Sequence, residues 1–279
     1  MKEYLPRRIP GAEVLITVKT YPQPYTAQGE IVCTAGMMRD GKWIRIHPVP
    51  FRADGFLQFR KYSWLKLDLI KKKSDKRPES YSPVGDHEVL ELVDTRNGWK
   101  QRRDLVLGNE YTSFAQLLAD AHGDKGTSLA VVKPSEILDF TWTPTDRDWP
   151  EKWKGQWAQG DFFFKLDESR IVRKVPYDFH YRFLTEGDEK PRRLMVTDWE
   201  VGALYWKCLE RSGADEKEAL RKVRERFYDD LALSRDLHFF VGSNYVQHVR
   251  NRPNPFMIVG VFYPPFAEEP QLTLNLPLN

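Results

Sequence analysis

The chain has 279 residues, enough for one large domain or two of ordinary size, and either would bury a substantial core. Hydrophobic residues make up 41% of the sequence and charged residues 30%, and no apolar run approaches the roughly 20 residues that a membrane helix needs. We therefore expect a globular protein without a membrane span. The basic N-terminus lacks a small-residue cleavage site, so we expect the protein to stay in the cytoplasm.

The net charge of +3 is unevenly distributed along the chain. Between Lys42 and Arg77, eleven Lys or Arg residues stand against three Asp residues, so this window carries +8 and the rest of the chain −5. Such an asymmetry indicates a surface for a polyanion. A solvated, lysine-rich loop around residues 71–73 would explain it as well.

Before residue 95 the sequence predicts about five strands and almost no helix. Short turns separate the strands, and Asp40-Gly41 is a typical tight-turn pair between two of them. Short strands joined in this way favour a small, curved β-barrel or a sandwich. The expected strands span residues 12–20, 29–37, 42–47, 62–70 and 87–93.

The middle of the chain mixes turn, helix and strand patterns. Residues 96–103 read as a basic turn, and Ser113 with Gln116 forms a capping box before a short helix. Two further strands are expected at 129–133 and 137–142. The segment 143–160 contains three tryptophans without helical or strand periodicity, and we expect the joint between two domains there.

The second half predicts strands that carry a helix pair. After a possible hairpin at 161–174, one strand places Tyr177, Phe179, Tyr181 and Phe183 on a single face, and burial of that face is favoured. Thr197 and Glu200 form a capping box for a helix that ends at Gly213, and Asp215 caps a second helix. Apolar strands at 237–241 and 256–263 close the fold.

These elements predict a mostly β, α+β protein with two small OB-like or barrel-like β domains. The expected divisions are an N-terminal barrel-like domain at 1–142, a Trp/Pro-rich joint at 143–160, a C-terminal α+β domain with the helix pair at 161–266, and a tail at 267–279.

One strand of the basic window alternates aromatic and cationic side chains. Trp43, Arg45 and His47 share a face because side chains alternate along a strand. Proteins that bind single strands combine a positive groove with aromatic rings on which bases stack. We therefore predict a non-catalytic protein that binds single-stranded or exposed DNA or RNA. The predicted binding residues are Trp43, Arg45, His47, Arg52, Arg60, Lys61, Trp99, Arg102, Arg103, Tyr245, His248, Arg250 and Arg252.

Two other functions stay open. Asp178, His180, Asp198 and Glu200 offer oxygen and nitrogen ligands of the kind that a metal-dependent nuclease or base-modifying enzyme uses. Acids in the first turn of a helix are also favoured by capping without any metal. A scaffold that binds a protein encoded nearby is the other alternative. Phosphate-binding glycine loops and a GxSxG elbow are absent from the sequence, and we expect no cofactor.

Several stretches resemble a known group of proteins. They are VLITVKTYP and EIVCTAGMMRDGKWIRIHPVPFR in the first half, and PYDFHYRF, LMVTDWEVGALYW, HFFVGS and FMIVGVFYPP in the second. Together they resemble uncharacterised prokaryotic proteins with dual OB-like domains that are associated with nucleic-acid modification or defence. The resemblance implies two OB-like barrels and a nucleic-acid context, and it assigns no catalytic residue.

Overall fold

A computed structural model describes residues 6–25, 29–50, 59–151 and 172–267. Several expected features lie outside these ranges. They are Arg52, most of the hairpin at 161–174, much of the joint at 143–160 and nearly all of the tail.

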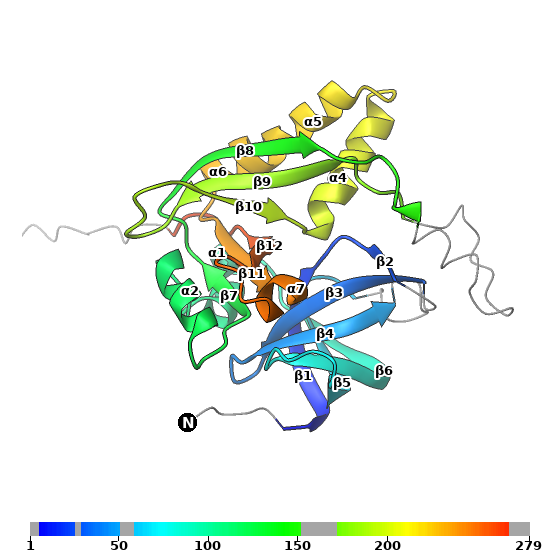
Figure 1. Ribbon diagram of the computed structural model, residues 1–279, viewed down its shortest axis with the longest axis vertical. Coiled ribbons are helices and arrows are strands. Elements are labelled where there is room, and N and C mark those ends of the chain that lie inside the picture. The colour runs from blue at the N-terminus through cyan, green and yellow to red at the C-terminus, as the bar shows by residue number, and fades with distance from the viewer. Residues whose placement is uncertain (1–5, 26–28, 51–58, 152–171, 268–279) are drawn as a thin grey trace, which may run out of the picture.

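The N-terminal half forms a closed barrel of five strands (Figure 1). The strands are β1 (Arg8–Lys19), β3 (Gly29–Met38), β4 (Trp43–Pro50), β5 (Ser63–Lys71) and β6 (Ser80–Leu92), and the short β2 (Gln23–Tyr25) pairs with β3. They follow the order β1-β5-β6-β4-β3, and the antiparallel pairing of β3 with β1 closes the barrel. The β4–β6 pair is parallel. This arrangement confirms the expected OB-like barrel.

The second sheet has six strands in the order β7-β11-β12-β10-β9-β8. The strands are β7 (Leu129–Val132), β8 (Glu136–Pro144), β9 (Tyr177–Leu184), β10 (Arg192–Val196), β11 (His238–Ser243) and β12 (Phe256–Phe262). Within the described ranges, no ladder joins β7 to β8, so the sheet is open. We expected β7 and β8 in the N-terminal domain, but they pair with β11 and β9. Pairing with strands that come much later in the sequence therefore determines to which sheet β7 and β8 belong.

The expected helix pair lies on the side of the second sheet away from the barrel (Figure 1). It consists of α4 (Trp199–Arg211) and α5 (Glu216–Arg224), and α5 continues into a π-helical turn, η2 (Glu225–Asp230), and α6 (Leu231–Ser234). Asp215 caps α5 as predicted. Asp198, and not Thr197, caps α4, because its carboxylate accepts the N–H of Glu200 at 3.0 Å.

Further helices occur among the described residues. They are α1 (Arg96–Val106), α2 (Phe114–His122) and α7 (Tyr245–Val249). The expected basic turn at 96–103 is a turn only at Asn97–Trp99, where φ is positive, and continues as α1. Ser113 caps α2 as predicted. The short α7 interrupts the expected loop between β11 and β12.

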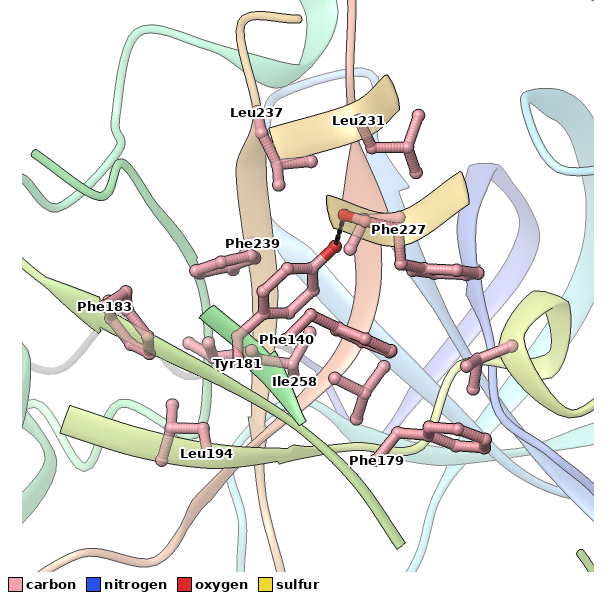
Figure 2. Packing of buried hydrophobic residues seen from close by; sticks show 14 of the residues in the cluster. Phe140, Phe179, Tyr181, Phe183, Leu194, Phe227, Leu231, Leu237, Phe239 and Ile258 are labelled. Atoms are coloured by element: carbon pink, nitrogen blue, oxygen red, sulfur yellow. Dashed lines mark hydrogen bonds between the residues drawn. The ribbon is translucent and has the colours of Figure 1, made fainter. Parts of the chain in front are cut away.

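An aromatic core holds the second sheet to its helices. Phe179, Tyr181 and Phe183 are buried, as the sequence predicts, and Tyr177 is half-buried. Figure 2 shows Tyr181 surrounded by this core, and its hydroxyl donates to the C=O of Phe227 in η2 at 2.5 Å. The hydrogen bond satisfies the only polar atom of this buried side chain and ties β9 to the π-helical turn.

Tyr21 joins the barrel to α4. Its N–H donates to the C=O of Thr197 at 2.8 Å, its ring stacks on Trp199 at 5.5 Å, and its hydroxyl accepts the indole N–H of Trp206 at 2.9 Å. The ring lies so close to α4 that a Cβ at Gly202 would stand 2.3 Å from it. Only glycine fits the helix at this contact.

We therefore expect Gly202→Ala to destabilise the protein by about 1–3 kcal/mol, because the new methyl group must displace Tyr21. In an unobstructed helix the same change stabilises by about 1 kcal/mol. Urea unfolding measures the difference. In a Tyr21→Ala background the same substitution should be neutral or stabilising, and a stabilising Gly202→Ala in the natural background would contradict the contact.

Candidate functional site

The strand face that we expected to bind nucleic acid is largely covered by the second sheet. Arg45 is only 5% exposed, and its guanidinium donates to the C=O of Ser128, just before β7, at 3.0 Å. Trp43 packs edge-on against Phe240 of β11, with ring centroids 5.9 Å apart. Alternation predicted which residues share this face. It could not predict that a later part of the chain covers it.

His47 lies at the margin of the same face. Its Nδ1 is 2.5 Å from the Nζ of Lys72. Burial and the neighbouring Lys72 charge lower the pKa of His47 to about 4, so the ring is neutral at pH 7. A neutral ring cannot supply the positive charge that we expected there.

A buried ionic network continues beneath this face. Arg77 binds the carboxylate of Asp75 through Nη2 at 2.6 Å and Nε at 2.9 Å, and its Nη1 donates to the C=O of Ser243 at 2.6 Å. Glu79 lies 3.4 Å from Arg45 and accepts the hydroxyl of Ser128. Because buried charges are costly unless they are paired, this network fixes the loop between β5 and β6 against the second sheet.

Lys61 forms a second buried ion pair between the halves. Its Nζ lies 2.8 Å from both carboxylate oxygens of Asp198 and 3.0 Å from Glu200. The Lys61 side chain is 11% exposed and that of Asp198 is fully buried. Burial opposes the charge of Lys61, but the attraction of Asp198 and Glu200 is stronger and raises its pKa. Lys61 is therefore engaged inside the protein, not on the predicted binding surface.

The four candidate metal ligands do not converge. Asp198 accepts Lys61 and the N–H groups of Glu200 and Val261, and His180 Nδ1 lies 2.9 Å from the guanidinium of Arg193. In the part of the chain that the structure describes, no group of three or more His, Cys, Asp or Glu side chains is placed to hold a metal ion. Asp178 stands on β9 and is half-buried.

The predicted basic patch on α1 is also engaged within the protein. Trp99 packs against Phe262 and Tyr263, with centroids 5.7 and 5.3 Å away. Arg102 donates to the C=O of Val93 at 2.7 and 2.9 Å. Arg103 forms an ion pair with Asp236 at 2.8 Å. These contacts attach α1 to both halves.

One further predicted segment, around Tyr245, contacts the lysine-rich loop. The hydroxyl of Tyr245, at the start of α7, donates to the C=O of Ser74 at 2.8 Å. Arg250 follows α7, about 7–8 Å farther along at a helical rise of roughly 1.5 Å per residue. Arg60 is exposed but precedes β5 and lies in neither segment. We call the exposed cations of these two segments, together with Tyr245, the basic rim, which consists of Lys73, Lys76, Tyr245, Arg250 and Arg252.

The cations of the basic rim are available to a ligand. Lys73, Lys76, Arg250 and Arg252 are all exposed, and within the described ranges none of them forms a salt bridge. His248, on α7, faces the buried network. Burial and the Arg77 charge lower its pKa, so it adds no charge at pH 7.

Sequence reasoning found the rim only in part. Tyr245, Arg250 and Arg252 were predicted, whereas Lys73 and Lys76 were counted in the basic window without being selected. The network residues Asp75, Arg77, Glu79 and Ser128 were missed. The alternation of Asp75, Arg77 and Glu79 could have indicated this network, because opposite charges two residues apart can lie on the same side of a turn and pair.

Lys61→Met should destabilise the protein by about 3–5 kcal/mol at pH 7, since it leaves the buried carboxylate of Asp198 without its cation. Burial raises the pKa of Asp198, so in the variant this group takes up a proton as the pH falls, and the loss should be smaller at pH 5. Urea unfolding at both pH values tests this. The exposed Lys66→Met on β5 is the matched control, and an equal loss at both pH values would argue against the buried pair.

Asp75→Asn should reduce stability in a pH-dependent way. Burial opposes the Asp75 charge, but the hydrogen bonds and charge of Arg77 prevail and lower its pKa to about 2. Because the pKa of Asp75 is lower in the folded than in the unfolded protein, its charge stabilises the fold by about 2 kcal/mol above about pH 4, the unfolded pKa. This contribution is lost as the pH falls towards about 2. The difference between natural protein and variant should therefore shrink below pH 4 in unfolding titrations. Asp124→Asn, at an exposed position, should show no such trend.

Within the described ranges, no helix has the length and apolar character to cross a membrane.

Comparison with known proteins gives families without an assigned role. Residues 10–108 match a domain of unknown function (DUF8758), and residues 110–279 match another (DUF8757). The division between these matches falls just after α1, close to the change from barrel to second sheet. No curated protein matches the chain. Since the second match spans more than half of the sequence, the chain belongs to the family described as domain of unknown function DUF8757.

Proposed function

We propose that the protein binds single-stranded or exposed nucleic acid through the basic rim, as a non-catalytic component of a larger prokaryotic system in the cytoplasm. One observation carries the proposal. Two segments that are 171 residues apart in the sequence meet through Tyr245 and Ser74, and together they present cations that lack a salt bridge among the described residues.

Unpaired cations suit the phosphates of a nucleic acid. Surface charges that already have partners gain little from a new anion, whereas Lys73, Lys76, Arg250 and Arg252 can each meet a phosphate. The buried Arg77 and Asp75 hold the loop beneath them in place. The cations are thus presented by a fixed backbone, which reduces the entropy lost on binding.

Tyr245 gives the rim an aromatic surface. It is 36% exposed while its hydroxyl is held by Ser74, so its ring is both accessible and oriented. A base that stacks on such a ring gains on the order of 1–3 kcal/mol, without sequence preference. Cations beside an oriented aromatic ring are the combination that single-strand binders use.

The position of the rim on the barrel agrees with this function. OB-folds bind oligonucleotides on one strand face and on adjacent loops, among them the loop between the last two strands. In this barrel that loop joins β5 to β6 and carries Lys73 and Lys76. The strand face with Trp43 and Arg45 is covered, so the loop is the part of that region that is left open. The resemblance to dual OB-like proteins of modification or defence systems suggests a protein partner encoded nearby.

Lys73→Ala combined with Arg252→Ala should weaken binding of a labelled single strand and reduce the slope of log K against log salt by about 1.4, at roughly 0.7 per lost phosphate contact. Fluorescence anisotropy at several salt concentrations measures both. Lys207→Ala with Lys217→Ala removes the same charge from the helix pair and should leave the slope unchanged. Equal effects of the two pairs, absence of binding, or cleavage of the probe would each contradict the proposal.

A further inference from the structure

A pocket of about 300 Å³ lies between the turn end of the barrel and the second sheet. The β3–β4 end of the barrel, the C-terminal end of α1 and the outer edge of β7 form its walls. Its volume is at the lower end of the range for small-molecule sites, which suits a ligand about as large as a nucleobase or nucleoside. The residues on which the inference depends are Trp43, Glu79, Leu107, Asn109, Ser128 and Leu129.

Buried polar groups form one side of the pocket. Glu79 is 7% exposed and Ser128 is 1% exposed, and the two are hydrogen-bonded to each other and to Arg45. The Nε of Arg45 is buried without a hydrogen-bond partner in the described part of the chain. Glu79 and Ser128 themselves line the pocket, so this buried network gives one of its walls a polar character.

The edge of β7 adds backbone groups. The N–H of Tyr111 donates to the C=O of Val131 at 2.8 Å, so Val131 directs its polar groups away from β11. Leu129 stands two residues earlier on the same strand and directs its N–H and C=O to the same side, because these directions alternate along a strand. The pocket wall therefore offers a donor and an acceptor next to each other.

The composition of the walls selects the ligand class. Lys and Arg are absent from the described residues that line the pocket, and Glu79 is already paired with Arg45, so a phosphate or carboxylate would meet no free cation on these walls. Trp43, Leu107 and Leu129 supply flat or apolar surface, and Asn109 supplies an amide that both donates and accepts. An uncharged, planar ligand with N–H donors and ring acceptors satisfies all of these groups.

We infer that this pocket binds a nucleobase, with the ring against Trp43 and its polar edge towards Glu79, Asn109 and the edge of β7. The base is that of a free nucleoside or an unstacked base of a strand. The inference goes beyond the basic rim and does not require it, because the proposed role of the rim is to bind phosphates, for which the described pocket walls offer no cation.

The test uses the full chain and the uncharged nucleosides adenosine, guanosine, cytidine and uridine, with ribose as the control without a base. Calorimetry and the shift in melting temperature report binding. A free base is supported if at least one nucleoside binds saturably and ribose does not. Asn109→Ala, at an exposed position, should weaken binding at least fivefold, and Leu107→Trp, which fills the pocket, should abolish it. Gln101→Ala, exposed on α1, should change nothing.

Two further experiments show whether the base is free or part of a strand, and whether the basic rim contributes to its binding. If nucleosides bind, Lys73→Ala with Arg252→Ala should leave their affinity unchanged, which supports a free base. If only single strands bind, Asn109→Ala should lower their affinity without changing the salt slope, which supports a base of the strand. If Asn109→Ala and Leu107→Trp alter neither nucleoside nor strand binding while both variants keep the natural melting temperature, the pocket assignment is overturned.

Discussion

The buried pair of Lys61 and Asp198 is the interaction on which the arrangement of the two halves depends. One carboxylate caps α4, accepts the N–H of Val261 on β12 and binds the cation from the barrel. A helix start, a central strand and the barrel are therefore held at one point. Among the described residues, Lys61 is the cation that forms a salt bridge with Asp198, so separating the halves would leave a buried carboxylate without compensation.

This tight junction also decides which surface is open to ligands. An OB-like barrel would ordinarily offer the strand face that includes Trp43 and Arg45, but here Phe240 and Ser128 cover it. Part of a potential binding surface of the barrel is thus buried against the second half of the same chain. What stays open are the loop between β5 and β6, which α7 supports, and the pocket where β7 diverges from the barrel.

Local patterns predicted much of the fold. Alternation predicted the buried face of β9 with Phe179, Tyr181 and Phe183, and Asp215 marked the start of α5. The failures share a physical cause, because they concern contacts between distant segments. Arg45 looked exposed since its partner Ser128 lies 83 residues away, and β7 and β8 were assigned by proximity in sequence. For the same reason the sequence indicated Tyr245 as a candidate, but it did not predict the hydrogen bond of Tyr245 to Ser74.

The order of synthesis adds a consequence for the covered face. Lys61 precedes Asp198 by 137 residues, so at translation rates of about 5–20 residues per second roughly 7–27 s separate the two. During this interval Lys61 has no Asp198 with which to pair, and Phe240 is not yet present to cover Trp43. The side chains that the complete protein buries at this strand face therefore have no cover until the second sheet has been made.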